Sequence, residues 1–413
     1  MKKLDFDIKR VISITAESLW FILLFLVSIN VLYRINEAVI ALLIGTIIYA
    51  LWYRHKITLN LELLILFMFG TAYFMLYITY MPYSPRTFVT FWLGAPAMYL
   101  IGRLFIAPRT EYLFKWVIYT FVSGLFIYGF LNMLPYLLAP DEVPDLRFAY
   151  DIWEGFKIVA TLQGIYFTGM ASLLVYNLMH LKLIRHMHLK IINFAAIGFS
   201  AYFSILLENR TFFFLTALVF VLSLLAELFL SKLKFWKPAL IASVFLALLY
   251  FGYTNDVIGV KTFVEASDWY QRFLTMWEAG IENDPRFPIY GLFKEQFLEF
   301  PLGGFQMNIN GLDYAHNLWI DTYYAVGLYP FILLVFYSLL TLITLIRVML
   351  SKYIKKDIKI LIFSVFIGYF INFMTEPILE GVPYIFLIFC LFNGLVYQYA
   401  RVRKEIRPRG ISS

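Results

Sequence analysis

Long apolar runs recur along this chain of 413 residues, and they limit its possible folds more than any other feature of the sequence. An α-helix needs about 20 apolar residues to cross the hydrocarbon core of a bilayer. Runs of about this length lie at 11–32, 36–53, 61–80, 88–107, 114–138, 158–178, 190–207, 211–230, 238–253, 316–346, 358–374 and 383–400. We therefore predict an all-α, polytopic integral membrane protein with about 12 transmembrane helices, folded as a single membrane domain over residues 1–413.

The overall composition excludes a water-soluble fold. Hydrophobic residues make up 62% of the chain and charged residues only 15%. A soluble protein could not bury so much apolar surface, because surface-to-volume scaling leaves too much of it outside. The single cysteine, Cys390, lies in an apolar run, which excludes disulfides and cysteine metal sites.

The net charge of +7 could indicate a nucleic-acid-binding protein, but the positions of the basic residues indicate a membrane orientation instead. When the runs are taken as alternating spans, 25 of the 34 lysines and arginines fall on one side of the membrane. Cytoplasmic loops carry such an excess of basic residues. We therefore predict that both termini are cytoplasmic, that segment 254–315 faces outward, and that nucleic acid is not a partner.

The outward segment 254–315 is much longer than a simple turn between spans. Trp269, Phe273 and Trp277 recur in it at close to helical spacing. A helix with this aromatic pattern could lie on the bilayer interface or pack directly on the spans, and the sequence favours neither. We predict a long extracytoplasmic loop with amphipathic helices.

The run 316–346 is too long for one span. As a helix it would measure about 46 Å, against about 30 Å for the hydrocarbon core. Gly327 and Pro330 offer a break. We predict a short outer helix over 314–326, followed by the true span.

Polar side chains of this short helix are predicted to share a face. Asn317 and Asp321 are four residues apart, and His316 and Tyr323 are seven apart. Residues at these spacings lie on nearly the same side of a helix. We therefore expect the four side chains to converge on a cavity at the outer membrane surface.

His316 is the only one of the five histidines that falls on the outer side in this arrangement. It could be a helix cap at the interface, or a neutral imidazole that takes a proton from a hydroxyl. The other four fall in cytoplasmic basic loops and are expected to be solvated. His186 and His188 have no carboxylate or cysteine nearby, so we predict no metal site.

Two outward arginines are candidate anion-binding residues. Arg210 begins a span, where the helix N-terminus adds positive potential. Arg286 lies between two prolines on a stiffened backbone. A guanidinium offers a rigid fork that matches phosphate. The alternatives are snorkelling or pairing with Glu208 for Arg210, and a salt bridge to Asp284 for Arg286.

The last outer loop contains Glu376 and Glu380. We interpret this loop as an ordinary polar turn. The sequence contains no nucleotide-binding loop, serine-hydrolase elbow or zinc-protease motif in a suitable context.

Three features, taken in order, resemble the bacterial O-antigen ligase and O-antigen polymerase superfamily. The first is 209–211 (NRT), which opens a span. The second is Arg286 followed by an amphipathic run and 300–304 (FPLGG). The third is 315–318 (AHNL) followed by Gly327. The resemblance covers 209–330 and the twelve-span layout.

The resemblance implies an inverting, metal-independent glycosyltransferase without cofactors, acting on the extracytoplasmic side of the bacterial plasma membrane. The donor would be a glycan on undecaprenyl pyrophosphate. Arg210 and Arg286 would hold the pyrophosphate, and His316 would activate the acceptor hydroxyl. Asn317, Asp321 and Tyr323 are expected to bind substrate. The implied partners are the lipid-linked donor, a glycan acceptor, membrane lipid, a flippase and a chain-length regulator.

Three functions remain open at this point. The leading prediction is polymerisation of lipid-linked repeat units into a surface polysaccharide, such as O-antigen, capsule or exopolysaccharide. A ligase that passes the glycan to a lipid core or another acceptor would use the same donor. A polysaccharide transporter or flippase is the alternative from another class, but the chain lacks the second comparable half of many transporters.

Overall fold

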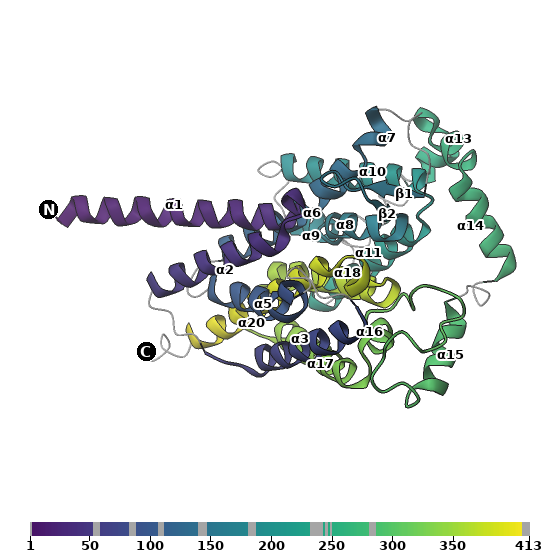
Figure 1. Cartoon of the computed structure of the whole chain (residues 1–413). Helices are drawn as coiled ribbons and strands as arrows, with labels where there is room; N and C mark the ends of the chain where they lie inside the picture. The colour runs from purple at the N-terminus through teal and green to yellow at the C-terminus, as the bar shows by residue number, and fades with distance from the viewer. Residues whose placement is uncertain are drawn as a thin grey trace.

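The computed structural model shows an almost entirely helical protein (Figure 1). The structure describes residues 2–52, 58–81, 88–105, 111–138, 147–180, 187–231, 243, 247, 250–280 and 286–406. Its one sheet within these ranges is an antiparallel hairpin of β1 (Phe148–Tyr150) and β2 (Lys157–Val159), in which Phe148 pairs with Val159. The prediction of an all-α membrane protein is therefore confirmed at the level of fold class.

Seven helices within the described ranges are long and apolar enough to cross a membrane. An apolar run forms a helix in a bilayer because the hydrocarbon core contains no water. Each backbone amide and carbonyl of the run must therefore be hydrogen-bonded within the helix. These long apolar helices are α3 (Leu61–Tyr80), α6 (Glu111–Asn132), α10 (Met187–Leu206), α11 (Arg210–Leu230), α17 (Leu328–Leu350), α18 (Lys356–Thr375) and α20 (Pro383–Ile406).

The remaining predicted spans fall on other helices or are undescribed. The other described helices of the bundle are α1 (Lys2–Ser28), η1 (Val31–Tyr33), α2 (Ile35–Trp52), η2 (Val89–Gly94), α5 (Ala95–Phe105), α7 (Leu134–Leu138), α8 (Ala160–Ser172) and α9 (Leu174–His180). The run predicted at 158–178 is thus divided at Leu173 between two helices, and most of the run 238–253 lies outside the described residues. The number twelve therefore stays a prediction.

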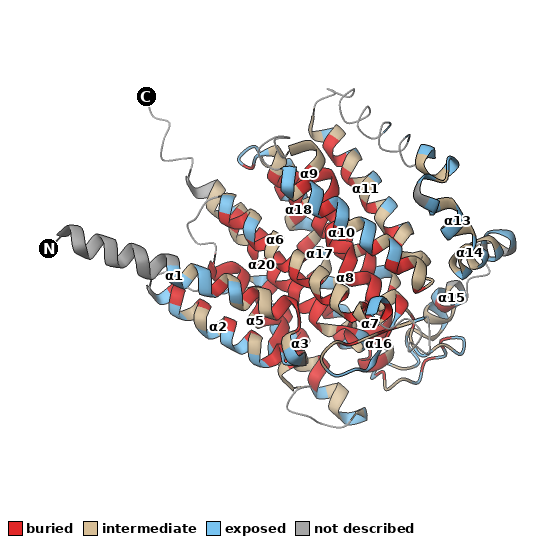
Figure 2. Ribbon diagram, turned by 90° about the horizontal axis from the view of Figure 1, so that it is seen from above, coloured by how far each residue is buried: buried red, intermediate tan, exposed pale blue. Residues whose placement is uncertain are grey.

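Close helix contacts form the centre of the bundle, which Figure 2 shows as a continuous buried region. A Cβ atom at Gly394 of α20 would lie 2.0 Å from the carbonyl oxygen of Tyr99 on α5, and one at Gly102 would lie 2.1 Å from that of Leu391. Small residues allow such backbone approach, and tight packing is the main force between helices in lipid. Helices α5 and α20 are therefore held in direct contact.

The two ends of the bundle differ. In both views α1 begins and α20 ends on one side, while the outer-loop helices lie on the other (Figures 1 and 2). These helices are η4 (Val257–Gly259), α13 (Val260–Glu265), α14 (Asp268–Ala279) and α15 (Phe287–Gln296). The side that holds α13–α15 is called the loop end below. Which end faces the cytoplasm remains a prediction.

The predicted break in the run 316–346 is present. Helix α16 (Leu318–Val326) ends at Gly327, which has a φ of 81°, and α17 starts at Leu328. The outer helix begins four residues later than predicted because Asn317 caps it. Pro330 lies inside the first turn of α17, where a missing amide hydrogen costs little.

The segment 300–304 fixes this break by direct backbone contact. The amide of Leu328 donates to the carbonyl of Pro301 at 2.8 Å, and that of Gly304 donates to Ala325 at 3.0 Å. A Cβ at Gly327 would lie 2.2 Å from the Pro301 oxygen, and one at Gly303 would lie 2.4 Å from the Gly327 nitrogen. Both positions therefore exclude any side chain larger than hydrogen.

Candidate functional site

Side chains of the N-cap and the first turn of α16 hold the loop that carries His316. The carboxylate of Asp321 accepts hydrogen bonds from the amides of Ala315 at 2.6 Å and Asn317 at 2.9 Å. The side-chain oxygen of Asn317 accepts from the amides of Trp319 and Ile320. These bonds hold His316 at a φ of 54°, a left-handed conformation that is uncommon for residues other than glycine.

His316 faces a buried carboxylate. Its Nδ1 lies 3.8 Å from Oε2 of Glu376, the residue that follows α18. The Glu376 side chain is 0% exposed, whereas the His316 side chain is 23% exposed. Neither carboxylate oxygen has a hydrogen-bond partner within the described chain. A buried carboxylate without a partner is costly, so the imidazole is the group positioned to compensate it.

This arrangement favours one histidine tautomer. A proton on Nδ1 can point at Glu376, which leaves the lone pair on Nε2 free to accept a proton. A carboxylate that orients an imidazole in this way also stabilises the imidazolium formed after proton transfer. The 3.8 Å separation exceeds a hydrogen bond, but such distances are often long before substrate binds. The pair can therefore act as a general base.

Glu380 adds a second buried carboxylate on the short helix α19 (Ile378–Gly381). Tyr73 donates to it at 2.7 Å, and burial raises the pKa of Glu380 above its usual range. Burial also raises the pKa of Asp321 to about 7, with further upward contributions from Glu380 and Glu376. Within the described ranges, no group of three metal-binding side chains is arranged to hold an ion.

The substrate-binding roles predicted for the α16 side chains do not fit their surroundings. Asp321 and Asn317 are buried and bonded to backbone amides, as described above. The Tyr323 hydroxyl donates to the carbonyls of Phe297 at 2.6 Å and Gln296 at 3.2 Å, and its ring is fully buried. The expectation that these groups converge with His316 on a cavity is corrected: α16 is covered by neighbouring segments, so they satisfy local backbone groups instead.

Arg210 lies in a basic cluster at the start of α11. Its Nη1 donates to the carbonyl of Arg272 on α14 at 2.9 Å. Arg272 itself forms an ion pair with Glu208, and Arg147 lies 3.8 Å from the same carboxylate. Two arginines therefore approach one glutamate, and Arg210 lies beside them through its bond to the Arg272 backbone. The sequence gives no reason to group Arg147 and Arg272 with Arg210, because their proximity depends on how distant segments pack.

Arg286 occupies the N-cap position of α15 and is half-buried. Helix α15 packs on α16, because Ile289 belongs to the same apolar cluster as Tyr323 and the rings of Phe293 and Tyr323 lie 5.3 Å apart. Helix α14 packs on α11, where the rings of Trp269 and Phe213 lie 5.0 Å apart. Both arginines are thus anchored at the loop end. Asp284, the alternative partner of Arg286, lies outside the described residues.

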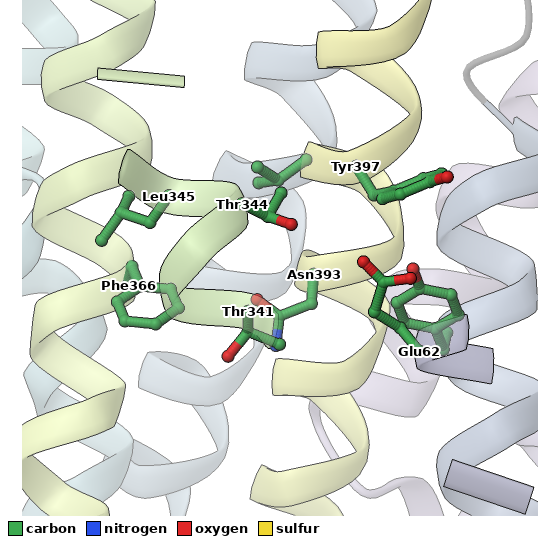
Figure 3. Close-up of a pocket in the computed structure, with 9 residues that line it drawn as sticks. Glu62, Thr341, Thr344, Leu345, Phe366, Asn393 and Tyr397 are labelled. Atoms are coloured by element: carbon green, nitrogen blue, oxygen red, sulfur yellow. The ribbon is translucent and has the colours of Figure 1, made fainter. Parts of the chain in front are cut away.

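A small pocket lies near the start of α3, beside Glu62. It is lined by Glu62 together with Thr341 and Asn393 (Figure 3) and has a volume of about 10 Å³. That volume holds about one water molecule. Glu62 accepts from Asn60 at 2.7 Å, and Asn60 accepts from Arg103 at 2.7 Å. These hydrogen bonds satisfy buried polar groups beside the pocket, which is itself too small for a substrate.

Comparison of the chain with protein-family models and with curated proteins gives no match. The sequence motifs are therefore not supported by a detected relative. Inference about function rests on the residues at the loop end, and above all on His316 and Glu376.

Proposed function

We propose that this protein transfers a glycan from a polyprenyl diphosphate carrier to a sugar hydroxyl, and that it polymerises lipid-linked repeat units into a surface polysaccharide at the outer face of the bacterial plasma membrane. The observation that carries the proposal is the partly exposed imidazole of His316 beside the buried carboxylate of Glu376. A hydroxyl nucleophile needs such a base near neutral pH.

The proposed step is an inverting displacement at the anomeric carbon of the donor sugar. Nε2 of His316 takes the proton of the acceptor hydroxyl, whose oxygen forms a bond to the anomeric carbon of the donor sugar. The bond from that carbon to the diphosphate oxygen breaks with inversion, and the electron pair leaves with the diphosphate. Glu376 stabilises the imidazolium, as an orienting carboxylate does in hydrolases that use a similar base.

The leaving diphosphate gains charge in this step, so cationic groups should bind it. Arg210 and Arg286 are the proposed ligands, because guanidinium groups bind phosphate oxygens in pairs. The proximity of Arg147 and Arg272 to Arg210 at the start of α11 supports this assignment. Cations aimed at developing charge are among the largest contributions to catalysis.

The lipid part of the donor needs an apolar groove. One of about 410 Å³ lies between α2, α3 and the continuous helix η2–α5, and its walls are almost wholly apolar. Leu43, Leu63 and Leu93 are among the residues that line it. We propose that it accepts the polyprenyl chain.

The decisive experiment uses purified protein in lipid nanodiscs with lipid-linked repeat units, followed by gel analysis of the glycans. A ladder of products supports the polymerase, and a single transfer to an added acceptor supports a ligase. His316→Ala should abolish either reaction. His188→Ala, on α10 and away from the loop end, is the matched control and should retain activity. Absence of product with wild-type protein, combined with movement of the lipid-linked glycan across the bilayer, would support a transporter.

A further inference from the structure

A cavity of about 370 Å³ adjoins the His316 loop but takes no part in the chemistry described so far. The β-hairpin, the start of α8 and the junction of α19 with α20 enclose most of it. Two of its lining residues connect it to the candidate site: Tyr314 lies two positions before His316, and Gly381 directly follows Glu380. The cavity volume is within the range of about 300–1,000 Å³ found for small-molecule sites.

Tyrosine rings form one wall of this cavity. The rings of Tyr128 and Tyr166 meet edge to face with centroids 5.0 Å apart, and those of Tyr166 and Tyr384 stack at 5.8 Å. Their contacts with one another fix the orientation of the wall. A flat aromatic surface in a cavity with a few polar groups suits a ligand that has both C–H faces and hydroxyls.

An unpaired hydrogen-bond acceptor lies at the edge of the same wall. Asn30 is 1% exposed and lines the cavity, and its Nδ2 donates to the Tyr128 hydroxyl at 3.4 Å. Its Oδ1 has no hydrogen-bond partner among the described residues. A buried acceptor left in this state is costly. A ligand hydroxyl could donate to it, whereas an alkyl chain or an ionised phosphate could not.

We infer that this cavity binds the acceptor saccharide of the transfer reaction. The inference rests on the proposed function for the identity of the reaction, and on the cavity itself for the class of ligand. Among the described lining residues there is no arginine, and the one cation is Lys157, whose Nζ lies 5.0 Å from the centroid of the Phe148 ring. A single lysine does not offer the paired donors that match a diphosphate. Tyr314 of the His316 loop lines the cavity although His316 does not, so a bound acceptor must extend past Tyr314 to bring its hydroxyl to the proposed base.

The first test measures binding without turnover. The probe is the oligosaccharide released by mild acid from the lipid-linked glycans of the source cells, titrated calorimetrically into wild-type protein in nanodiscs. Saturable binding is expected. Tyr314→Ala should weaken it about tenfold or more, whereas Tyr314→Phe keeps the ring and should bind within a few fold of wild type. Tyr290→Ala, an exposed tyrosine on α15 outside the cavity, is the matched control and should bind normally.

A second variant tests the unpaired acceptor. Asn30→Gly removes the side chain at a φ of 46°, a conformation that glycine adopts without strain. It should also weaken binding about tenfold, and thermal melting should confirm that it folds. Absence of saturable binding to wild-type protein, or equal binding by wild type, Tyr314→Ala and Asn30→Gly, would overturn the inference.

Kinetics separate this inference from the proposed function. If both hold, the two cavity variants raise KM for the acceptor about tenfold and leave KM for the donor unchanged. If transfer occurs but the variants leave the acceptor KM unchanged, the cavity is not the acceptor site although the proposed function stands. If the oligosaccharide binds and the variants abolish binding, but no transfer occurs, the saccharide site stands and the transfer reaction fails.

Discussion

The Nδ1 atom of His316 and the Oε2 atom of Glu376 lie 3.8 Å apart, although 59 residues separate them in the chain. Asp321 and Asn317 position the histidine, while the end of α18 positions the glutamate. The distance therefore depends on how α16 and α18 pack together, and each side of the pair can be tested independently.

Glu376→Gln should lower kcat about 100-fold or more. The amide can no longer stabilise the imidazolium, and its NH2 group can favour the wrong imidazole tautomer. Affinity for the donor should change little, because the glutamate is buried behind the histidine. Steady-state kinetics with lipid-linked substrate provide the measurement. If the folded Glu376→Gln protein keeps the wild-type kcat, the carboxylate has only a structural role.

Arg286→Ala should lower kcat/KM about 100- to 1000-fold, since a lost contact to developing charge typically costs about 2.7–4 kcal/mol. Arg286→Lys keeps the charge but loses the paired donors, so it should be intermediate. Inhibition by inorganic pyrophosphate should weaken in the same order. Lys294→Ala, on the same helix, is the control. Unchanged pyrophosphate inhibition in both Arg286 variants would remove Arg286 from the donor site.

Arg210→Lys should also impair transfer, because Arg210 is the second proposed ligand of the diphosphate. The wild-type guanidinium also bonds to the carbonyl of Arg272, so melting temperature must be measured alongside activity. A loss of activity with an unchanged melting temperature is expected. A matching loss of both would instead assign Arg210 to the attachment of α14.

Asp321 should make stability depend on pH. Its pKa is raised in the folded protein from 3.8 to about 7, so its favourable contribution is present at low pH and is lost as pH rises through about 7. The melting temperature of wild type minus that of Asp321→Asn should therefore be larger at pH 5 than at pH 8, by a few degrees. A difference that grows with pH would contradict the raised pKa.

The orientation can be tested by labelling whole cells with an impermeant thiol reagent. Ala266→Cys, at an exposed position between α13 and α14, should react, and Lys352→Cys, exposed after α17, should not. The native Cys390 is buried and gives little background. The reverse pattern would place the candidate site in the cytoplasm and exclude an extracellular polysaccharide reaction.

The break at Gly327 could be predicted from the sequence because the length of a membrane span is a local constraint. The run 316–346 exceeded a membrane span, and Gly327 marked the break that the structure contains. The break at Leu173 had no comparable signal, because neither glycine nor proline occurs there. Helical spacing also identified an aromatic stripe on α14, where the rings of Trp269 and Phe273 stack.

The site was harder to predict because its geometry depends on contacts between distant segments. Glu376 precedes Pro377 in a short polar stretch, which resembles a solvated turn until α18 and α19 bury it. Tyr323 has the helical spacing expected of a residue beside His316, but spacing does not reveal which segment covers that face. Burial in tertiary structure decides both cases.

The backbone contact between Gly303 and Gly327 also bears on how the chain could be divided. It attaches the segment before α16 to the first turn of α17 through main-chain groups, independently of α13 and α14. Proteolytic cleavage within α13 or α14 should therefore leave Arg286 and His316 on one structural unit with α17. Arg210 would remain on the other fragment, so cleaved protein would report whether the two halves must stay covalently joined for the donor to be held.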